Sequence, residues 1–152
     1  MKQEKRWVRP VFYALLAFLV IIGLFYTFRP MDLMNTPPET VGKIVLTDCA
    51  TASAAEITDP ERIEGFMAVL NAAGITRSGN AEQDPPERGV LVAVYTTDGN
   101  LEDSWNNFYV IDPTTIQRSG YVFTVRNASF NLDALIAAAN GERGHRRYAP
   151  LR

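Results

Sequence analysis

The stretch VFYALLAFLVIIGLFYTF, residues Val11 to Phe28, contains eighteen residues and no charge. As an α-helix it would be about 27 Å long, close to the ~30 Å hydrocarbon core of a bilayer. A helix that is apolar on every side needs lipid or a large protein around it, and this chain has only 152 residues. The stretch therefore predicts a transmembrane helix over residues 11–28, with the bilayer as its partner.

The two flanks of this stretch predict its orientation. Four basic residues precede it, the last of them Arg9, whereas Arg29 is the one basic residue close behind it. Cytoplasmic flanks carry the excess of Lys and Arg, so we expect residues 1–10 to lie in the cytoplasm. Pro10 suits the first turn of the helix, where a missing N–H costs no hydrogen bond. We therefore expect a single-pass protein of the cell membrane whose C-terminal domain is extracytoplasmic.

A cleaved secretory signal is the alternative interpretation of the same stretch. Such signals usually have 7 to 15 apolar residues followed by small residues at the cleavage site. Here the apolar run is longer, and it leads into Thr27-Phe28-Arg29-Pro30. We expect an uncleaved anchor, with a secreted protein as the alternative.

Charge is divided unevenly along the rest of the chain. Residues 30–141 carry six basic and fifteen acidic side chains, whereas the tail of residues 142–152 carries four basic and one acidic. Nucleic-acid binding needs clustered Lys and Arg, so the acidic body excludes nucleic acid as a partner. We expect the basic tail to be a solvated, disordered end.

A linker and one domain are expected after the anchor. Residues 29–40, RPMDLMNTPPET, contain three prolines and no apolar periodicity, which is typical of a semi-rigid spacer. Residues 41–141 are about the length of one domain. Apolar and β-branched runs within it predict four strands, over residues 41–48, 90–98, 105–112 and 121–127.

Two helices are predicted between and after these strands. The first begins at Asp59-Pro60-Glu61: Asp59 is the N-cap, Pro60 takes the first helical position, and Glu61 complements the positive end of the helix. Gly74 is the expected stop of this helix. The second is capped by Asn131 or Ser129 and ends at Gly141. The apolar faces consist of Ile63, Phe66, Met67 and Leu70 in the first helix, and Leu132, Leu135, Ile136 and Ala139 in the second.

The order of these elements predicts an α+β fold. A β-α-β-β-β-α domain would contain a four-stranded, mainly antiparallel sheet covered by two helices.

Residues for catalysis or cofactor binding are scarce. The one His (His145) and the one Cys (Cys49) cannot supply a zinc site or a His-based nucleophilic site, and neither glycine-rich phosphate motif occurs. A calcium site is an alternative, because Asp98, Asn100, Glu102 and Asp103 could supply oxygen ligands. The glycine and the distal glutamate that define a calcium-binding loop are missing from this segment. We therefore expect no enzyme activity and no cofactor. We expect Cys49 to be buried and to pack as a small hydrophobic residue.

Aromatic residues beside the third predicted strand are the candidate ligand contacts. Trp105, Phe108 and Tyr109 would form a platform for a peptide or glycan if their side chains share a face, and residues four apart on a strand do share one. Packing in the core or at the sheet edge is the alternative.

Residues 41–140 resemble a family of small extracytoplasmic α+β domains of Gram-positive, clostridia-like bacteria. The likeness rests on the Asp59-Pro60-Glu61 helix start with Ile63 and Leu70, on Phe108-Tyr109-Val110-Ile111 with Pro113, and on Gly120-Tyr121. The resemblance implies attachment outside the cell by a lipid or a single span, and it implies no catalytic residue.

The sequence thus favours a non-enzymatic, membrane-anchored module that binds a protein, peptide or cell-wall component outside the cytoplasm. A structural accessory subunit of a membrane complex, a secreted protein and an unrecognised hydrolase are the alternatives.

Overall fold

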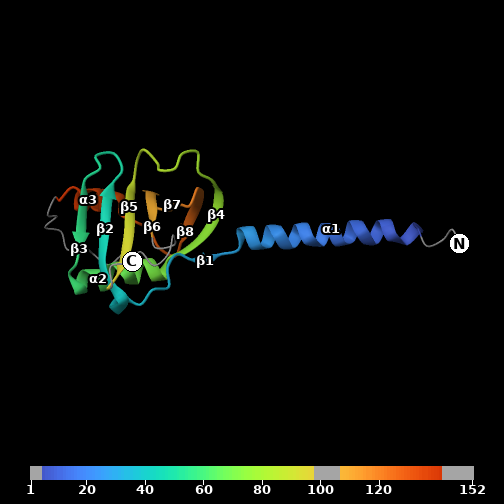
Figure 1. Cartoon of the computed structure of the whole chain (residues 1–152), viewed down its shortest axis with the longest axis horizontal. Helices are drawn as coiled ribbons and strands as arrows, with labels where there is room; N and C mark the ends of the chain where they lie inside the picture. Colours follow the sequence, from blue (N-terminus) through green and yellow to red (C-terminus); the bar gives the residue numbers. More distant parts are fainter. Residues whose placement is uncertain (1–4, 98–106, 142–152) are drawn as a thin grey trace.

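The computed structural model describes residues 5–97 and 107–141, with side chains from Pro10 onward. It consists of a long N-terminal helix, α1 (Lys5–Phe28), that projects from a domain built on one antiparallel sheet (Figure 1). The strands of this sheet are β1 (Met31–Asp32), β2 (Val41–Asp48), β3 (Ala54–Ile57), β4 (Gly74–Asn80), β5 (Val90–Thr96), β6 (Asn107–Asp112), β7 (Thr115–Arg118) and β8 (Tyr121–Arg126). The remaining elements are helices α2 (Pro60–Ala72) and α3 (Leu132–Ala139) and a short 3-10 helix, η1 (Pro38–Thr40).

The sheet has eight strands in the order β1-β4-β8-β7-β6-β5-β2-β3, and every neighbouring pair is antiparallel. The α+β class, the N-terminal apolar helix and the antiparallel sheet are confirmed. The expectation of four strands is wrong, because β1, β3, β4 and β7 lie in segments with weak or no strand signal. Successive strands β5 to β8 form the central meander.

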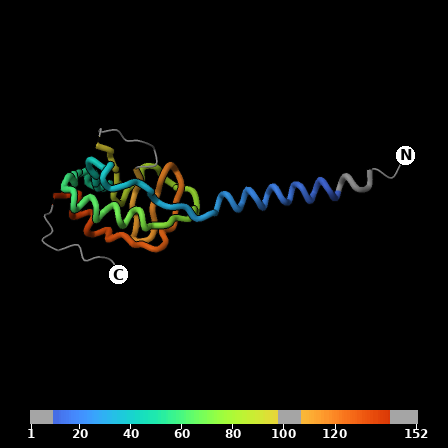
Figure 2. The backbone as a smooth tube through the Cα atoms, turned by 90° about the horizontal axis from the view of Figure 1, so that it is seen from below, coloured from blue at the N-terminus to red at the C-terminus, as the bar shows by residue number. Residues whose placement is uncertain are grey.

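Helices α2 and α3 lie on the same side of the sheet (Figure 2). The first carries the chain from β3, at one edge, back to β4 near the other edge, and the second packs against β2 and β3. One face of the sheet therefore forms a core with the helices, and we call the opposite face the outer face.

The helix boundaries follow the predicted signals in part. Pro60 is the first residue of α2 as expected, although the Asp59 side chain makes no capping hydrogen bond. Asn131 caps α3 by accepting a hydrogen bond from the backbone N–H of Ala134 at 3.0 Å. Gly74 directly follows the C-cap residue Ala73, the expected place of a stop glycine, but its φ is not left-handed and it is already the first residue of β4.

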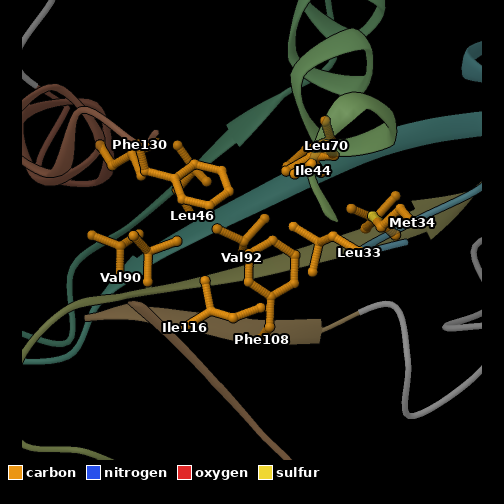
Figure 3. Packing of buried hydrophobic residues seen from close by; sticks show 14 of the residues in the cluster. Leu33, Met34, Ile44, Leu46, Leu70, Val90, Val92, Phe108, Ile116 and Phe130 are labelled. Carbon is orange, nitrogen blue, oxygen red and sulfur yellow. The ribbon is translucent and has the colours of Figure 1, made fainter. Parts of the chain in front are cut away.

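The core is a continuous apolar cluster between the sheet and the helices (Figure 3). Ile44, Leu46, Val92 and Phe108 project from the sheet, and Leu70 meets them from α2. Each fully buried side chain of this kind stabilises the fold by about 1.5–3 kcal/mol relative to exposure. The cluster accounts for a stable domain in a chain whose single cysteine cannot form an internal disulfide.

The segment of residues 29–40, which we call the connecting segment, differs from the expected spacer. It contributes β1 and η1, and the side chains of Leu33 and Met34 are 2% and 5% exposed within the core. Leu33 N–H donates to the Ala73 carbonyl at 2.8 Å. The segment is packed into the domain because its apolar residues fill space between α2 and the sheet (Figure 3).

Helix α1 is long and apolar enough to cross a membrane. Over Pro10–Phe28 its mean hydropathy is 2.4, and none of this span is buried within the protein. Tyr13 and Tyr26 stand near the two ends of the span and are 65% and 67% exposed. A membrane anchor and a signal sequence both have this character.

Candidate functional site

The three predicted ligand contacts do not form one surface. Phe108 lies in the core and is 1% exposed, whereas Tyr109 is half-buried. Successive residues of a strand point to opposite faces, so Tyr109 belongs to the outer face and Phe108 does not. Trp105 lies outside the described residues. Of this trio, Tyr109 is the one whose described position is compatible with a ligand contact.

The predicted flanks of the membrane helix lie at its two ends. Arg29 directly follows α1 and is exposed. Pro10 lies inside α1 rather than in its first turn, because the helix begins five residues earlier, at Lys5. Arg9 belongs to the same helix, and its side chain is outside the described set.

Strand register identifies the other side chains of the outer face. Residues paired across antiparallel strands share a face, so Tyr109 stands beside Leu91 on β5 and Gln117 on β7. The same row continues to Thr47 on β2 and Val122 on β8. Sequence patterns do not reveal this row, because its apolar and polar residues come from five different strands and form no pattern along any one of them.

The loop of residues 81–89 covers part of the outer face. Gln117 Nε2 donates to the Gln83 carbonyl at 2.7 Å, and Gln117 is only 5% exposed. Burial raises the pKa of Tyr109, and the charge of Asp84 and the nearby Cys49 thiol raise it further. The Tyr109 hydroxyl is therefore protonated at neutral pH, which suits hydrogen bonding rather than base catalysis.

The half of the outer face over β2, β3 and β5 carries a charged and aromatic cluster. Lys43 Nζ lies 2.8 Å from Glu56 Oε1 and 5.2 Å from the centre of the Tyr95 ring. The hydrogen bond to Glu56 raises the pKa of Lys43, so this amine stays charged. Val45 pairs with Glu56, lies beside the cluster and is half-buried. We call Lys43, Val45, Glu56 and Tyr95 the Tyr95 patch.

The Tyr95 patch is suited to binding rather than to stabilising the fold. Exposed ion pairs contribute about 0–1 kcal/mol, and the Lys43 and Glu56 side chains are 37% and 55% exposed. An aromatic ring beside a cation and an apolar side chain presents surface that a protein or peptide partner can cover. Sequence reasoning missed the patch, since its members come from three strands and β3 was not expected.

Cys49 has little capacity for nucleophilic chemistry. It is half-buried rather than fully buried as expected, and burial raises the pKa of its thiol. The thiolate is the reactive form of cysteine, so the thiol is a weak nucleophile at neutral pH.

Asp48 is 4% exposed and forms a polar cluster with two exposed residues, Thr51 and Asn140. Asn140 Nδ2 donates to Asp48 Oδ2 at 3.0 Å, and the Thr51 hydroxyl donates to the same oxygen at 2.9 Å. These bonds, the Asn140 bond foremost, and the Ala50 N–H lower the pKa of Asp48. The cluster joins the β2–β3 turn to the end of α3, so its role is structural. An Asp at the end of a strand before small polar residues could have signalled this turn.

Arg118 is a second buried polar residue that sequence reasoning missed. It is 2% exposed, its Nη1 and Nη2 atoms lie 3.3 Å from the Leu33 carbonyl oxygen, and its guanidinium stands 5.3 Å from the centre of the Phe108 ring. Burial lowers its pKa to about 10, so the side chain is still charged at neutral pH. Arg118 holds the connecting segment against the sheet.

Metal ligands do not converge in the described part of the chain. Within residues 5–97 and 107–141, no group of three or more His, Cys, Asp or Glu side chains is placed to hold an ion. The calcium alternative at Asp98, Asn100, Glu102 and Asp103 falls outside the described residues.

Comparison of the chain with models of protein families, with curated proteins and with solved structures found no match.

Proposed function

We propose that this chain is a membrane-anchored, extracytoplasmic interaction module that binds a protein, peptide or cell-wall component without catalysing a reaction. In this proposal α1 crosses the cell membrane with its N-terminus in the cytoplasm, and the Tyr95 patch faces the partner.

One observation carries the proposal. Every side chain of the span Pro10–Phe28 lies outside the protein's own core, although their mean hydropathy is 2.4. Keeping such a surface in water would cost roughly 25 cal/mol for each Å² of apolar area. A bilayer removes that cost, so the helix is suited to lipid and has no other cover within the described chain.

The connection between α1 and the domain favours an anchor over a cleaved signal. Only Arg29 and Pro30 separate the end of the helix from β1, and neither is a small residue of the kind that signal cleavage prefers. Cleavage farther along would remove residues of β1 or the buried Leu33 from the folded domain.

Cell fractionation and topology labelling test the anchor directly. A chain carrying Cys49→Ala and Ala54→Cys presents one exposed thiol on β3. In intact cells it should react with a membrane-impermeant maleimide, and the protein should stay in the membrane fraction after carbonate extraction. A soluble product that lacks its first thirty or so residues would favour the secreted alternative instead.

The accessory-subunit alternative differs in where recognition takes place. An accessory subunit would be recognised through α1 within the bilayer, whereas the proposed module is recognised through its sheet. Proximity labelling from the C-terminal end of the chain, compared with a Tyr95→Ala and Lys43→Ala variant, separates the two. Loss of labelled partners in that variant supports the module.

A further inference from the structure

We infer that the β4 edge of the sheet lies against the surface of the bilayer that holds α1, where Arg29 and Arg77 contact phospholipid phosphates. The inference rests on the proposed function, since it requires α1 to be in the membrane. It adds an orientation for the domain and a second contact with lipid.

The first step is the shortness of the connection. Phe28 ends α1 and Met31 begins β1, so two residues lie between them. Consecutive Cα atoms are 3.8 Å apart, and three such steps span at most about 11 Å. The domain therefore cannot stand away from the point where the helix leaves the membrane.

The second step is the attachment of the connecting segment to the domain. Met31 pairs with Ile75, and Asp32 pairs with Gly74, which fixes β1 along the start of β4. Beyond β1, Arg118 holds the Leu33 carbonyl at 3.3 Å. These contacts fix the connecting segment to the domain from Met31 onward, so Arg29 and Pro30 alone join α1 to the folded domain.

The third step is the direction of α1 relative to the sheet. In Figures 1 and 2 the helix leaves the domain at the β4 end, and its axis crosses the strands steeply. Transmembrane helices tilt by about 20° on average from the bilayer normal. The β4 edge thus faces the membrane, and β3, six strand spacings away in the sheet order, lies about 29 Å farther out at ~4.8 Å per spacing.

The chemistry of the β4 edge suits a headgroup layer. Arg77 stacks on the Tyr121 ring at 3.7 Å and donates to Asn80 at 2.7 Å, and Tyr121 is 40% exposed. Arg29 is exposed at the adjoining end of α1, with Asp32 as the nearby acid on β1. Guanidinium groups bind phosphate through charge-assisted hydrogen bonds, and tyrosine is enriched at membrane interfaces.

The open side of β4 supplies further donors. Its pairing with β1 covers only Gly74 and Ile75, and the rest of this strand has no second neighbouring strand in the described sheet. An unpaired strand edge presents backbone N–H groups, and lipid phosphates can accept hydrogen bonds from them.

Fluorescence quenching in vesicles tests the orientation. The full chain, with Cys49→Ala and one new cysteine, is reconstituted in vesicles of phosphatidylcholine and phosphatidylglycerol and labelled with an environment-sensitive dye. Ser78→Cys reports on β4, Ala54→Cys on β3 and Leu19→Cys on the middle of α1, and all three positions are exposed. A headgroup nitroxide should quench the Ser78 label strongly and leave the Ala54 label nearly unchanged.

The Leu19 label separates this inference from the proposed function. If an acyl-chain nitroxide quenches it while the headgroup nitroxide quenches the Ser78 and Ala54 labels equally, the orientation is overturned and the anchor stands. If the acyl-chain nitroxide leaves it unquenched, the anchor itself fails, and the inference falls with it.

A charge reversal tests the contact with phosphates. Arg29→Glu with Arg77→Glu should reduce quenching of the Ser78 label, whereas Arg62→Glu, at an exposed position early in α2, should not change it. Near-ultraviolet circular dichroism establishes that each variant is folded. Unchanged quenching in the folded double variant would overturn the assignment of Arg29 and Arg77 to lipid phosphates.

Discussion

Arg118 links two parts of the chain that lie far apart in sequence, the connecting segment and the central meander. Burying an arginine is costly unless its guanidinium finds acceptors, and here the Leu33 carbonyl supplies one and the Phe108 ring lies within cation–π distance. A polar side chain thus sets the path of an apolar segment through the core.

We expect Arg118→Ala to destabilise the domain by about 3 kcal/mol, because it leaves a cavity and removes the donors of the Leu33 carbonyl. Arg118→Met keeps most of the side-chain volume and should destabilise the domain less, by about 1–2 kcal/mol, because it only leaves the Leu33 carbonyl without these donors. Urea unfolding of the full chain in detergent measures both. A Met variant as stable as the parent would contradict the role of the guanidinium.

Gly89 occupies a backbone conformation that other residues avoid. Its φ is +113°, and a Cβ placed there would collide with the Val110 carbonyl oxygen. We expect Gly89→Ala to lower the free energy of unfolding by at least about 2 kcal/mol. The matched control is Gly65→Ala in α2, where a Cβ meets no atom within 4 Å and alanine should stabilise the helix by about 0.5–1 kcal/mol. Equal effects of the two changes would refute this reasoning.

Asp48 should make the stability of the domain depend on acid pH. Hydrogen bonds from Asn140, Ala50 and Thr51 hold its pKa below the ordinary value. Because the folded pKa is the lower one, this stabilisation is complete above the unfolded pKa of about 3.9 and is lost as the pH falls through the folded value. The urea midpoint of the parent should therefore fall more steeply below about pH 5 than that of Asp48→Asn.

A second acid limits how flat the Asp48→Asn profile can be. Burial tends to raise the pKa of Asp112, but hydrogen bonds from Thr114 and Thr115 lower it on balance. The variant should retain part of the acid dependence for this reason. Parallel profiles for parent and variant would argue against a stabilising Asp48 carboxylate.

At the scale of elements, the predictable parts were those with a strong local signal. The strands β2, β5, β6 and β8 have apolar or β-branched runs, and α2 and α3 have apolar faces and recognisable first residues. In contrast, β4 reads GITRSGN, with Ile75 as its one buried residue. Its conformation is imposed by pairing with β8, which no local pattern reveals.

Strand β7 is not predicted from the sequence for a different reason. It has four residues, and its polar Gln117 and Arg118 are both buried. Polar residues between a proline and a glycine favour a turn in sequence-based reasoning. Here each polar side chain finds a partner in a distant segment, Gln83 for one and Leu33 for the other, and those partners depend on the tertiary fold.

The connecting segment yields a prediction at the same scale. A chain that starts at Arg29 keeps β1, Leu33 and Met34 and should fold as a soluble domain. A chain that starts at Val41 loses them, and we expect a cost above about 5 kcal/mol, since each large buried side chain removed costs about 2–5 kcal/mol. Typical domains have only 5–15 kcal/mol in total. Circular dichroism and urea titration compare the two, and a stable domain from Val41 would show that the segment is dispensable.

For the whole molecule, the sequence predicts an apolar helix in front of an α+β domain, but it does not reveal the Tyr95 patch. The predicted trio of Trp105, Phe108 and Tyr109 follows from spacing along one strand, whereas a surface depends on which strands are neighbours. Tyr95, Lys43 and Glu56 meet because β5, β2 and β3 are adjacent in the sheet. That adjacency is a property of the complete topology.

Replacing α1 tests whether recognition belongs to the domain or to the helix. We expect a chain with an unrelated apolar span of equal length, joined at Arg29, to keep its proximity-labelled partners, because the Tyr95 patch and the connecting segment are intact. The domain makes its described core without side chains of the span, so its stability should not change. A parallel chain with the native α1 and Tyr95→Ala should lose the partners. The opposite pattern, loss with the foreign span and retention with Tyr95→Ala, would identify the protein as a subunit recognised through its membrane helix.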